Sequence, residues 1–164
     1  MPLRSDNYYR SMVEAQLRQA GITEPPVPVG DIAAVLGVPT MKVALPAWFS
    51  GAIVLEGGLP VLLLNASSSP EGRRATLAHM LAHLLVRIAD PTIPYPRDSE
   101  PEHRLAETLA EELIMPEFLV RDQAAKWFND YRYLARLFGV SEADMLEKMR
   151  DLKIIKTRGI TWDY

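Results

Sequence analysis

The stretch ATLAHMLAHLLV, residues 75–86, contains two of the three histidines of this 164-residue chain. His79 and His83 are four positions apart, and their neighbours are almost all apolar. Successive residues of an α-helix are about 100° apart, so positions separated by four residues lie on one face. Because the run is apolar nearly all round, it predicts a buried helix over residues 73–87 with both imidazoles on the same side.

The histidine pair has the frame of the H-E-x-x-H motif, in which both histidines bind zinc and the glutamate acts as general base. Here the glutamate position holds Met80, which cannot accept a proton. Two ligands rarely make a stable zinc site, so a third must come from elsewhere in the chain. The third histidine, His103, opens a second predicted helix and is the candidate. A pair of core histidines without metal, each with its own hydrogen-bond partners, is the alternative.

The composition excludes several classes of protein. With 48% apolar and 24% charged residues, the chain is typical of a globular domain rather than a disordered one. The net charge of −3 provides no basic field for nucleic acid. The chain has no cysteine, which excludes disulfides and thiolate metal ligands. No apolar run approaches the ~18 residues of a membrane helix, and the N-terminus lacks a signal core. We therefore expect a cytoplasmic protein with no membrane partner and no direct nucleic-acid partner.

The periodicity of the chain predicts an α+β fold that is mainly helical with a small sheet. Aliphatic runs on both sides of Gly57 and Gly58 predict a hairpin within residues 50–66, and residues 40–45 alternate like a strand. The second run of the hairpin, PVLLLNA, is so apolar that a buried strand is preferred to an exposed edge. Further helices are predicted over residues 7–20, 31–37, 102–114, 117–126, 130–138 and 141–151. A proline-rich loop is predicted at residues 89–102, and the tail from residue 153 is predicted to be a strand or loosely docked.

Four blocks in order resemble the ImmA/IrrE family of bacterial and phage zinc metallopeptidases. They are DIAAVLGV (31–38), SGAIVLEGGLPVLLLNASSSPEGRRATLAH (50–79), AEELIMP (110–116) and LARLFGVSEADMLEKMRDLKII (134–155). The resemblance implies a gluzincin-like architecture, in which a small sheet packs beside the metal-binding helix. We expect a single domain over residues 1–164. Its parts are an N-terminal helix and proline-rich connection (1–29), a metallopeptidase-like core (30–120), and C-terminal helices with a tail (121–164).

Carried over to this chain, the family's metal site falls on three histidines. The two helix ligands match His79 and His83, and the catalytic glutamate falls on Met80. The third ligand falls on His103 when the block is counted back from LIMP, whereas another registration places it on Leu105. We prefer His103, because all three histidines then occupy ligand positions. The resemblance implies zinc as the cofactor, and imidazole ligands also suit other divalent transition metals. Glu107, four residues after His103, either accepts a hydrogen bond from the second ring nitrogen of His103 or is a solvated surface carboxylate.

Met80 leaves two functions open. In the first, the chain is a degenerate metallopeptidase-like protein that regulates or binds a helix-turn-helix repressor, as the resemblance implies, in a stress response or a mobile element. In the second, it is an active metal-dependent peptidase or hydrolase with a relocated general base. The carboxylates considered for that role lie on the second helix: Glu102, Glu107, Glu111 and Glu112. Of these, Glu111 and Glu112 are expected to face solvent or to cap structure through local pairs. The block LARLFGVSEADMLEKMR itself resembles a helix-turn-helix but has no basic recognition face, so we interpret it as a packing motif.

Overall fold

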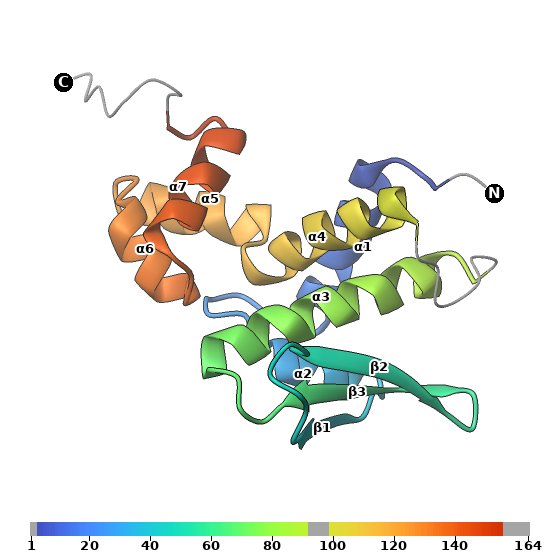
Figure 1. The fold of residues 1–164 in the computed structure, drawn as a ribbon. Helices are drawn as coiled ribbons and strands as arrows, with labels where there is room; N and C mark the ends of the chain where they lie inside the picture. Colours follow the sequence, from blue (N-terminus) through green and yellow to red (C-terminus); the bar gives the residue numbers. More distant parts are fainter. Residues whose placement is uncertain (1–2, 92–98, 156–164) are drawn as a thin grey trace. The chain divides into compact units, whose positions relative to one another are not determined.

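The computed structural model describes residues 3–91 and 99–155 and divides the chain into two compact units (Figure 1). The first unit comprises Met1–Ile22 and Pro28–Ile114, and the second comprises Thr23–Val27 and Met115–Tyr164. Much of the predicted proline-rich loop and most of the predicted tail lie outside the described residues. The predicted α+β class, mainly helical with a small mixed sheet, is confirmed.

The first unit contains four helices and three strands among its described residues. They are α1 (Asp6–Gln19), α2 (Val29–Val35), β1 (Thr40–Val43), β2 (Gly51–Glu56), β3 (Leu59–Asn65), α3 (Pro70–Ala89) and α4 (Glu100–Ile114). Each corresponds to a predicted element, with boundaries that differ by up to three residues. No helix in the described part of the chain is long and apolar enough to cross a membrane.

The sheet of the first unit has the strand order β1-β3-β2. β2 and β3 form the predicted antiparallel hairpin, and β1 lies parallel to β3 on its other side. Gly57 and Gly58 have φ angles of 58° and 82°, the left-handed conformation that a tight two-residue hairpin turn requires. β3 is therefore the central, largely buried strand, as its apolar sequence predicted, and β2 is an edge strand.

The helix α3 is the centre of the first unit and packs against the sheet on one side and α4 on the other (Figure 1). It begins three residues earlier than predicted. The Ser69 side chain accepts a hydrogen bond from the backbone N–H of Gly72 at 3.0 Å, and Pro70 occupies the first helical position. Both features are strong helix starts, because they satisfy or avoid the unpaired N–H groups of the first turn.

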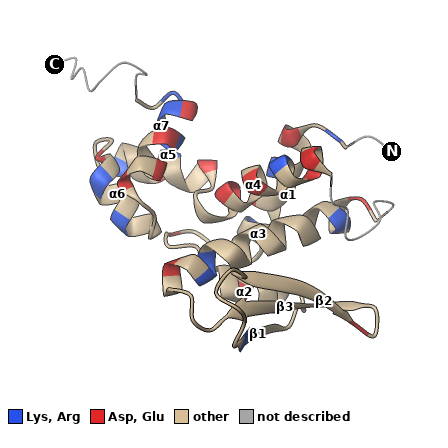
Figure 2. Cartoon of the chain, viewed as in Figure 1, with Lys and Arg blue, Asp and Glu red and all other residues tan. Residues whose placement is uncertain are grey.

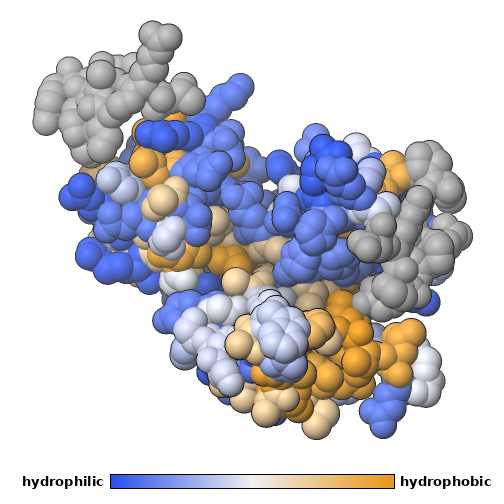
Figure 3. Space-filling model, in the orientation of Figure 1, coloured by the Kyte–Doolittle hydropathy of each residue, from blue (hydrophilic) through white to orange (hydrophobic). Residues whose placement is uncertain are grey.

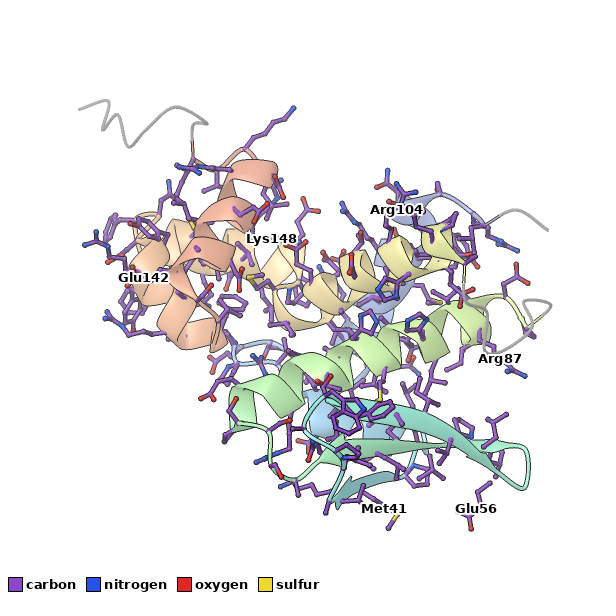
Figure 4. The ribbon with its side chains drawn as sticks, viewed as in Figure 1. Met41, Glu56, Arg87, Arg104, Glu142 and Lys148 are labelled. Atoms are coloured by element: carbon purple, nitrogen blue, oxygen red, sulfur yellow. The ribbon has the colours of Figure 1, made fainter. Side chains whose placement is uncertain are left out.

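The two faces of the sheet differ. Leu62 and Leu64 are buried and lie on the face toward α3, since Leu64 pairs with Gly51, whose α-carbon faces that helix. Met41 extends from β1 on the side away from α3 and is exposed (Figure 4). Figure 2 shows few charged residues on the strands, and Figure 3 shows apolar side chains gathered over the hairpin. The core of the unit thus lies on both sides of α3, between α3 and the sheet and among α1, α3 and α4.

The second unit contains α5 (Glu117–Lys126), α6 (Tyr131–Phe138) and α7 (Glu142–Asp151) among its described residues. Asp130 caps α6 by accepting from two backbone N–H groups, and Gly139 ends that helix at φ 67°. Ser141 caps α7, as predicted, by accepting from the N–H of Asp144 at 3.0 Å. α6 and α7 pack together and bury side chains that include Phe138 and Met145, consistent with a packing motif.

Candidate metal site

The three histidines of the chain lie together between α3 and α4. One ring nitrogen from each of His79, His83 and His103 can be chosen so that all three lie within 4.8 Å of one another. The Nε2 atoms of His79 and His83 are 3.2 Å apart, and the rings of His79 and His103 have centroids 5.1 Å apart. The structure thus brings together the three residues that the sequence indicated as ligands.

The packing of α4 on α3 positions His103. α4 is amphipathic: Leu105 and Leu109 are buried on its inner face, while Glu100 and Arg104 form an exposed pair at 3.8 Å on its outer face (Figure 4). His103 is at the margin between the two faces and is exposed, whereas the histidines of α3 are half-buried. The cluster is therefore open to solvent on the α4 side.

Glu107 lies beside His103, as expected from their spacing of four residues on one helix. Its Oε1 atom is 3.5 Å from Nε2 of His103, and both side chains are more than half exposed. The carboxylate also acts on His79. Burial lowers the pKa of His79 below its ordinary 6.5, the neighbouring His83 and His103 lower it further, and Glu107 opposes them. Glu107 is thus the carboxylate on the open side of the cluster.

Glu102 is the residue whose position was not foreseen. It is 2% exposed, and its Oε1 atom lies 3.6 Å from Nδ1 of His83. The sequence contained a signal for this placement, because Glu102 is three and four residues before Leu105 and Ala106 and continues their buried stripe. Glu112 falls on the same stripe and is also buried, so of its two expected placements, in solvent or in a local pair, the first was wrong.

Met80, at the position of the motif's glutamate, points toward the β2 strand of the sheet. Its side chain is 5% exposed, and its methyl carbon lies 3.4 Å from where a Cβ atom on Gly51 of β2 would be. The start of the edge strand therefore passes directly over this turn of α3. At this position the chain has an apolar packing contact, where the H-E-x-x-H motif has an acid.

A solved structure of a Mycobacterium tuberculosis transcriptional regulator is similar to this chain, with a TM-score of 0.66 and 18% sequence identity. The similarity covers 94% of this chain and 49% of that one, so this chain spans about half the length of that regulator. At this identity the likeness shows a shared fold only. Among curated proteins, none matches the chain.

The family model described as the IrrE N-terminal-like domain matches residues 32–149. The match covers most of the chain and contains all three histidines. It confirms the family resemblance that the four sequence blocks predicted. The chain therefore belongs to the family of IrrE N-terminal-like domains, the ImmA/IrrE group of peptidases and their relatives.

Proposed function

We propose that this protein is a regulatory, metallopeptidase-like module that binds one divalent transition metal ion through His79, His83 and His103 and does not cleave peptides. The observation that carries the proposal is the pairing of two features on α3. One face contributes to a cluster of three imidazoles, and the other has the buried Met80 where a general base would be required.

The donor set fits a zinc ion. Two nitrogens that are each about 2.05 Å from a tetrahedral centre are about 3.3 Å apart. The Nε2 atoms of His79 and His83 are 3.2 Å apart. Neutral imidazole suits zinc, and also cobalt and nickel. Three protein ligands leave a fourth position open, as in catalytic zinc sites, and a gluzincin-like architecture with the sheet beside the metal helix would account for the arrangement.

The residues around the cluster determine what chemistry it supports. A bound divalent ion would supply Lewis acidity, which polarises a carbonyl group or a water molecule. Amide cleavage also needs a group that takes a proton and returns it to the leaving nitrogen, a contribution of about 10²–10⁴-fold in rate. Met80 cannot do this, and Glu102 is buried beside His83. The site is therefore better suited to holding an ion, or a partner's side chain on that ion, than to hydrolysis.

An active hydrolase with a relocated base is the second candidate, and Glu107 is the residue that favours it. Its carboxylate is exposed, lies 3.5 Å from His103 and influences the pKa of His79, so it is on the side where a substrate would approach. In that case Glu107→Gln would abolish hydrolysis while leaving metal binding largely intact.

The proposed partner is a helix-turn-helix transcriptional repressor in the cytoplasm, acting within a stress response or a mobile element. The family membership and the structural similarity to a transcriptional regulator support a regulatory role. The net charge of −3 and the mixture of acidic and basic residues along α7 favour a protein partner over direct contact with DNA.

Elemental analysis of the purified protein tests the proposal first. We expect one equivalent of metal in the wild-type protein and in Arg104→Gln, a control on the outer face of α4, and none in His79→Ala. A cleavage assay on a helix-turn-helix repressor should then show no product with wild-type protein and product with Met80→Glu. Metal-free wild-type protein would refute the site, and cleavage by wild-type protein would favour the hydrolase.

A further inference from the structure

The feature that the proposed site leaves unused is the buried carboxylate of Glu102. It lies in the first turn of α4, next in sequence to His103, and is 2% exposed, whereas Glu100 and Arg104 in the same turn are exposed. Burying a carboxylate is costly unless it is paired with a donor or a charge. His83, which faces it from α3, is within ion-pair distance of it.

The ring of His83 has different neighbours at its two nitrogens. Nε2 faces Nε2 of His79 at 3.2 Å, inside the cluster, and Nδ1 faces Oε1 of Glu102 at 3.6 Å. The second distance is longer than a hydrogen bond, which needs about 2.7–3.2 Å, and a small rotation of either side chain closes the gap. A carboxylate at Nδ1 favours the tautomer that carries its proton there, and this leaves the lone pair of Nε2 directed into the cluster.

The charge of the cluster gives Glu102 a second role. Three neutral imidazoles leave the charge of a divalent ion uncompensated by its ligands. Glu102 and Glu107 are the carboxylates within ion-pair distance of these histidines among the described residues. Glu107 is 61% exposed, so solvent and salt screen it, while Glu102 is buried and acts through a medium of lower dielectric constant.

We propose that Glu102 is a positioning residue for the metal site. It holds His83 in the tautomer and orientation that present Nε2 to the ion, and it supplies a buried, weakly screened negative charge behind a neutral ligand set. The proposal rests on the proposed metal site. A merely structural role, filling space under the first turn of α4, would affect stability but neither the tautomer of His83 nor the affinity for metal.

Two variants separate the parts of this role. Glu102→Gln keeps the shape and an oxygen that accepts from Nδ1 but removes the charge, and Glu102→Leu removes both. Glu107→Gln is the matched control, because it removes a carboxylate from the same helix at the exposed side of the cluster. Circular dichroism establishes that each variant is folded, and Glu102→Gln, which has the same shape, serves if Glu102→Leu does not fold.

The measurements are zinc affinity, by competition with a chelating dye, and the tautomer of His83 in the metal-free protein, by ¹⁵N NMR of the imidazole. We expect zinc affinity to fall about 10-fold in Glu102→Gln and up to about 100-fold in Glu102→Leu, the range typical of residues behind a ligand, and less in Glu107→Gln. We expect the Nδ1–H tautomer of His83 in wild type and Glu102→Gln, and its loss in Glu102→Leu. If the wild-type protein binds zinc and both Glu102 variants bind it with the same affinity, this inference is overturned and the proposed metal site is not. Absence of zinc binding by the wild-type protein would overturn it together with the proposed site.

Discussion

The side of α3 that faces α4 and the side that faces the sheet have different roles in this protein. Toward α4, His79 and His83 join His103 in a cluster whose nitrogens can lie within 4.8 Å of one another. Toward the sheet, Met80 is buried against the first residue of β2. Met80 lies about 100° around the helix from His79 and about 60° from His83, so the general-base position borders the ligand face and can still change separately from the ligands. The comparison teaches that the capacity to hold a metal and the capacity to move a proton are separable features of one helix.

Removing a ligand should have the largest effect. In His83→Ala we expect zinc affinity to fall by more than the ~10–100-fold typical of residues behind a ligand. Competition titration with a chelating dye measures this, with Met80→Leu on the other face as the control that keeps wild-type affinity. Equal affinity in His83→Ala and wild type would mean that the α4-facing side of α3 is no metal site.

Shortening the Met80 side chain tests whether the sheet-facing side of α3 is closely packed. Met80→Ala leaves a cavity in a close-packed region and is expected to cost about 2–5 kcal/mol of unfolding free energy. Met80→Leu keeps the volume and should cost less than about 1.5 kcal/mol. Urea unfolding of the metal-free proteins provides both values. If Met80→Ala were as stable as wild type, the contrast between a packed face and a chemical face would not hold.

A substitution at Gly51 of β2 tests, from the sheet, the same contrast between the packed side and the metal-binding side of α3. A Cβ atom there would lie 2.6 Å from the carbonyl oxygen of Leu63 and 2.9 Å from Cγ2 of Thr76. Because a backbone oxygen cannot move aside easily, Gly51→Ala should destabilise by about 1–3 kcal/mol. Gly30→Ala in α2 is the control, since its Cβ would meet nothing within 4 Å, and it should be neutral or stabilising by up to ~1 kcal/mol. Similar unfolding midpoints for the two variants would contradict the close approach of β2 to α3.

The pH dependence of the metal-free protein should show the smallest effect. Burial lowers the pKa of His79 below its ordinary 6.5, so the unfolded chain binds its proton more readily than the folded one. The stability that this group contributes is therefore present above pH 6.5 and is lost as the pH falls through the folded-state pKa. Thermal unfolding midpoints between pH 8 and pH 5 measure it, and His79→Gln should fall less steeply. If the unfolding midpoint of His79→Gln fell as steeply with pH as that of the wild-type protein, groups other than His79 would be responsible for the pH dependence.

The elements of the fold were predictable because their signals are local. The apolar runs around Gly57 and Gly58 specify a hairpin, and the apolar run around His79 and His83 specifies α3, although the Ser69 cap places its start three residues earlier than predicted. The central place of β3 is a non-local property, since it depends on β1 returning parallel to it from the other side. Its uninterrupted apolar sequence was nevertheless a correct indication of burial.

The site was predictable to the extent that it follows helical spacing. His79 and His83 share a face because they are four residues apart. The approach of His103 depends on how α4 packs against α3, and it was inferred from the need for a third ligand and from the family resemblance. Glu102 was weighed as one of several carboxylates, because the charge of a side chain is a weaker guide to its exposure than its place on the buried stripe of α4. The contact between Met80 and Gly51 joins two segments whose pairing no local pattern encodes.

His103 lies in the first turn of α4, and the opening turn of a helix has N–H groups without partners inside the helix and frays most readily. An ion shared with His79 and His83 would fasten that turn to the middle of α3. Metal loading would then appear as slower amide hydrogen exchange at the start of α4, with the rest of the helix little changed. The availability of metal would then change the local stability of a single helical turn, with no large rearrangement of the fold.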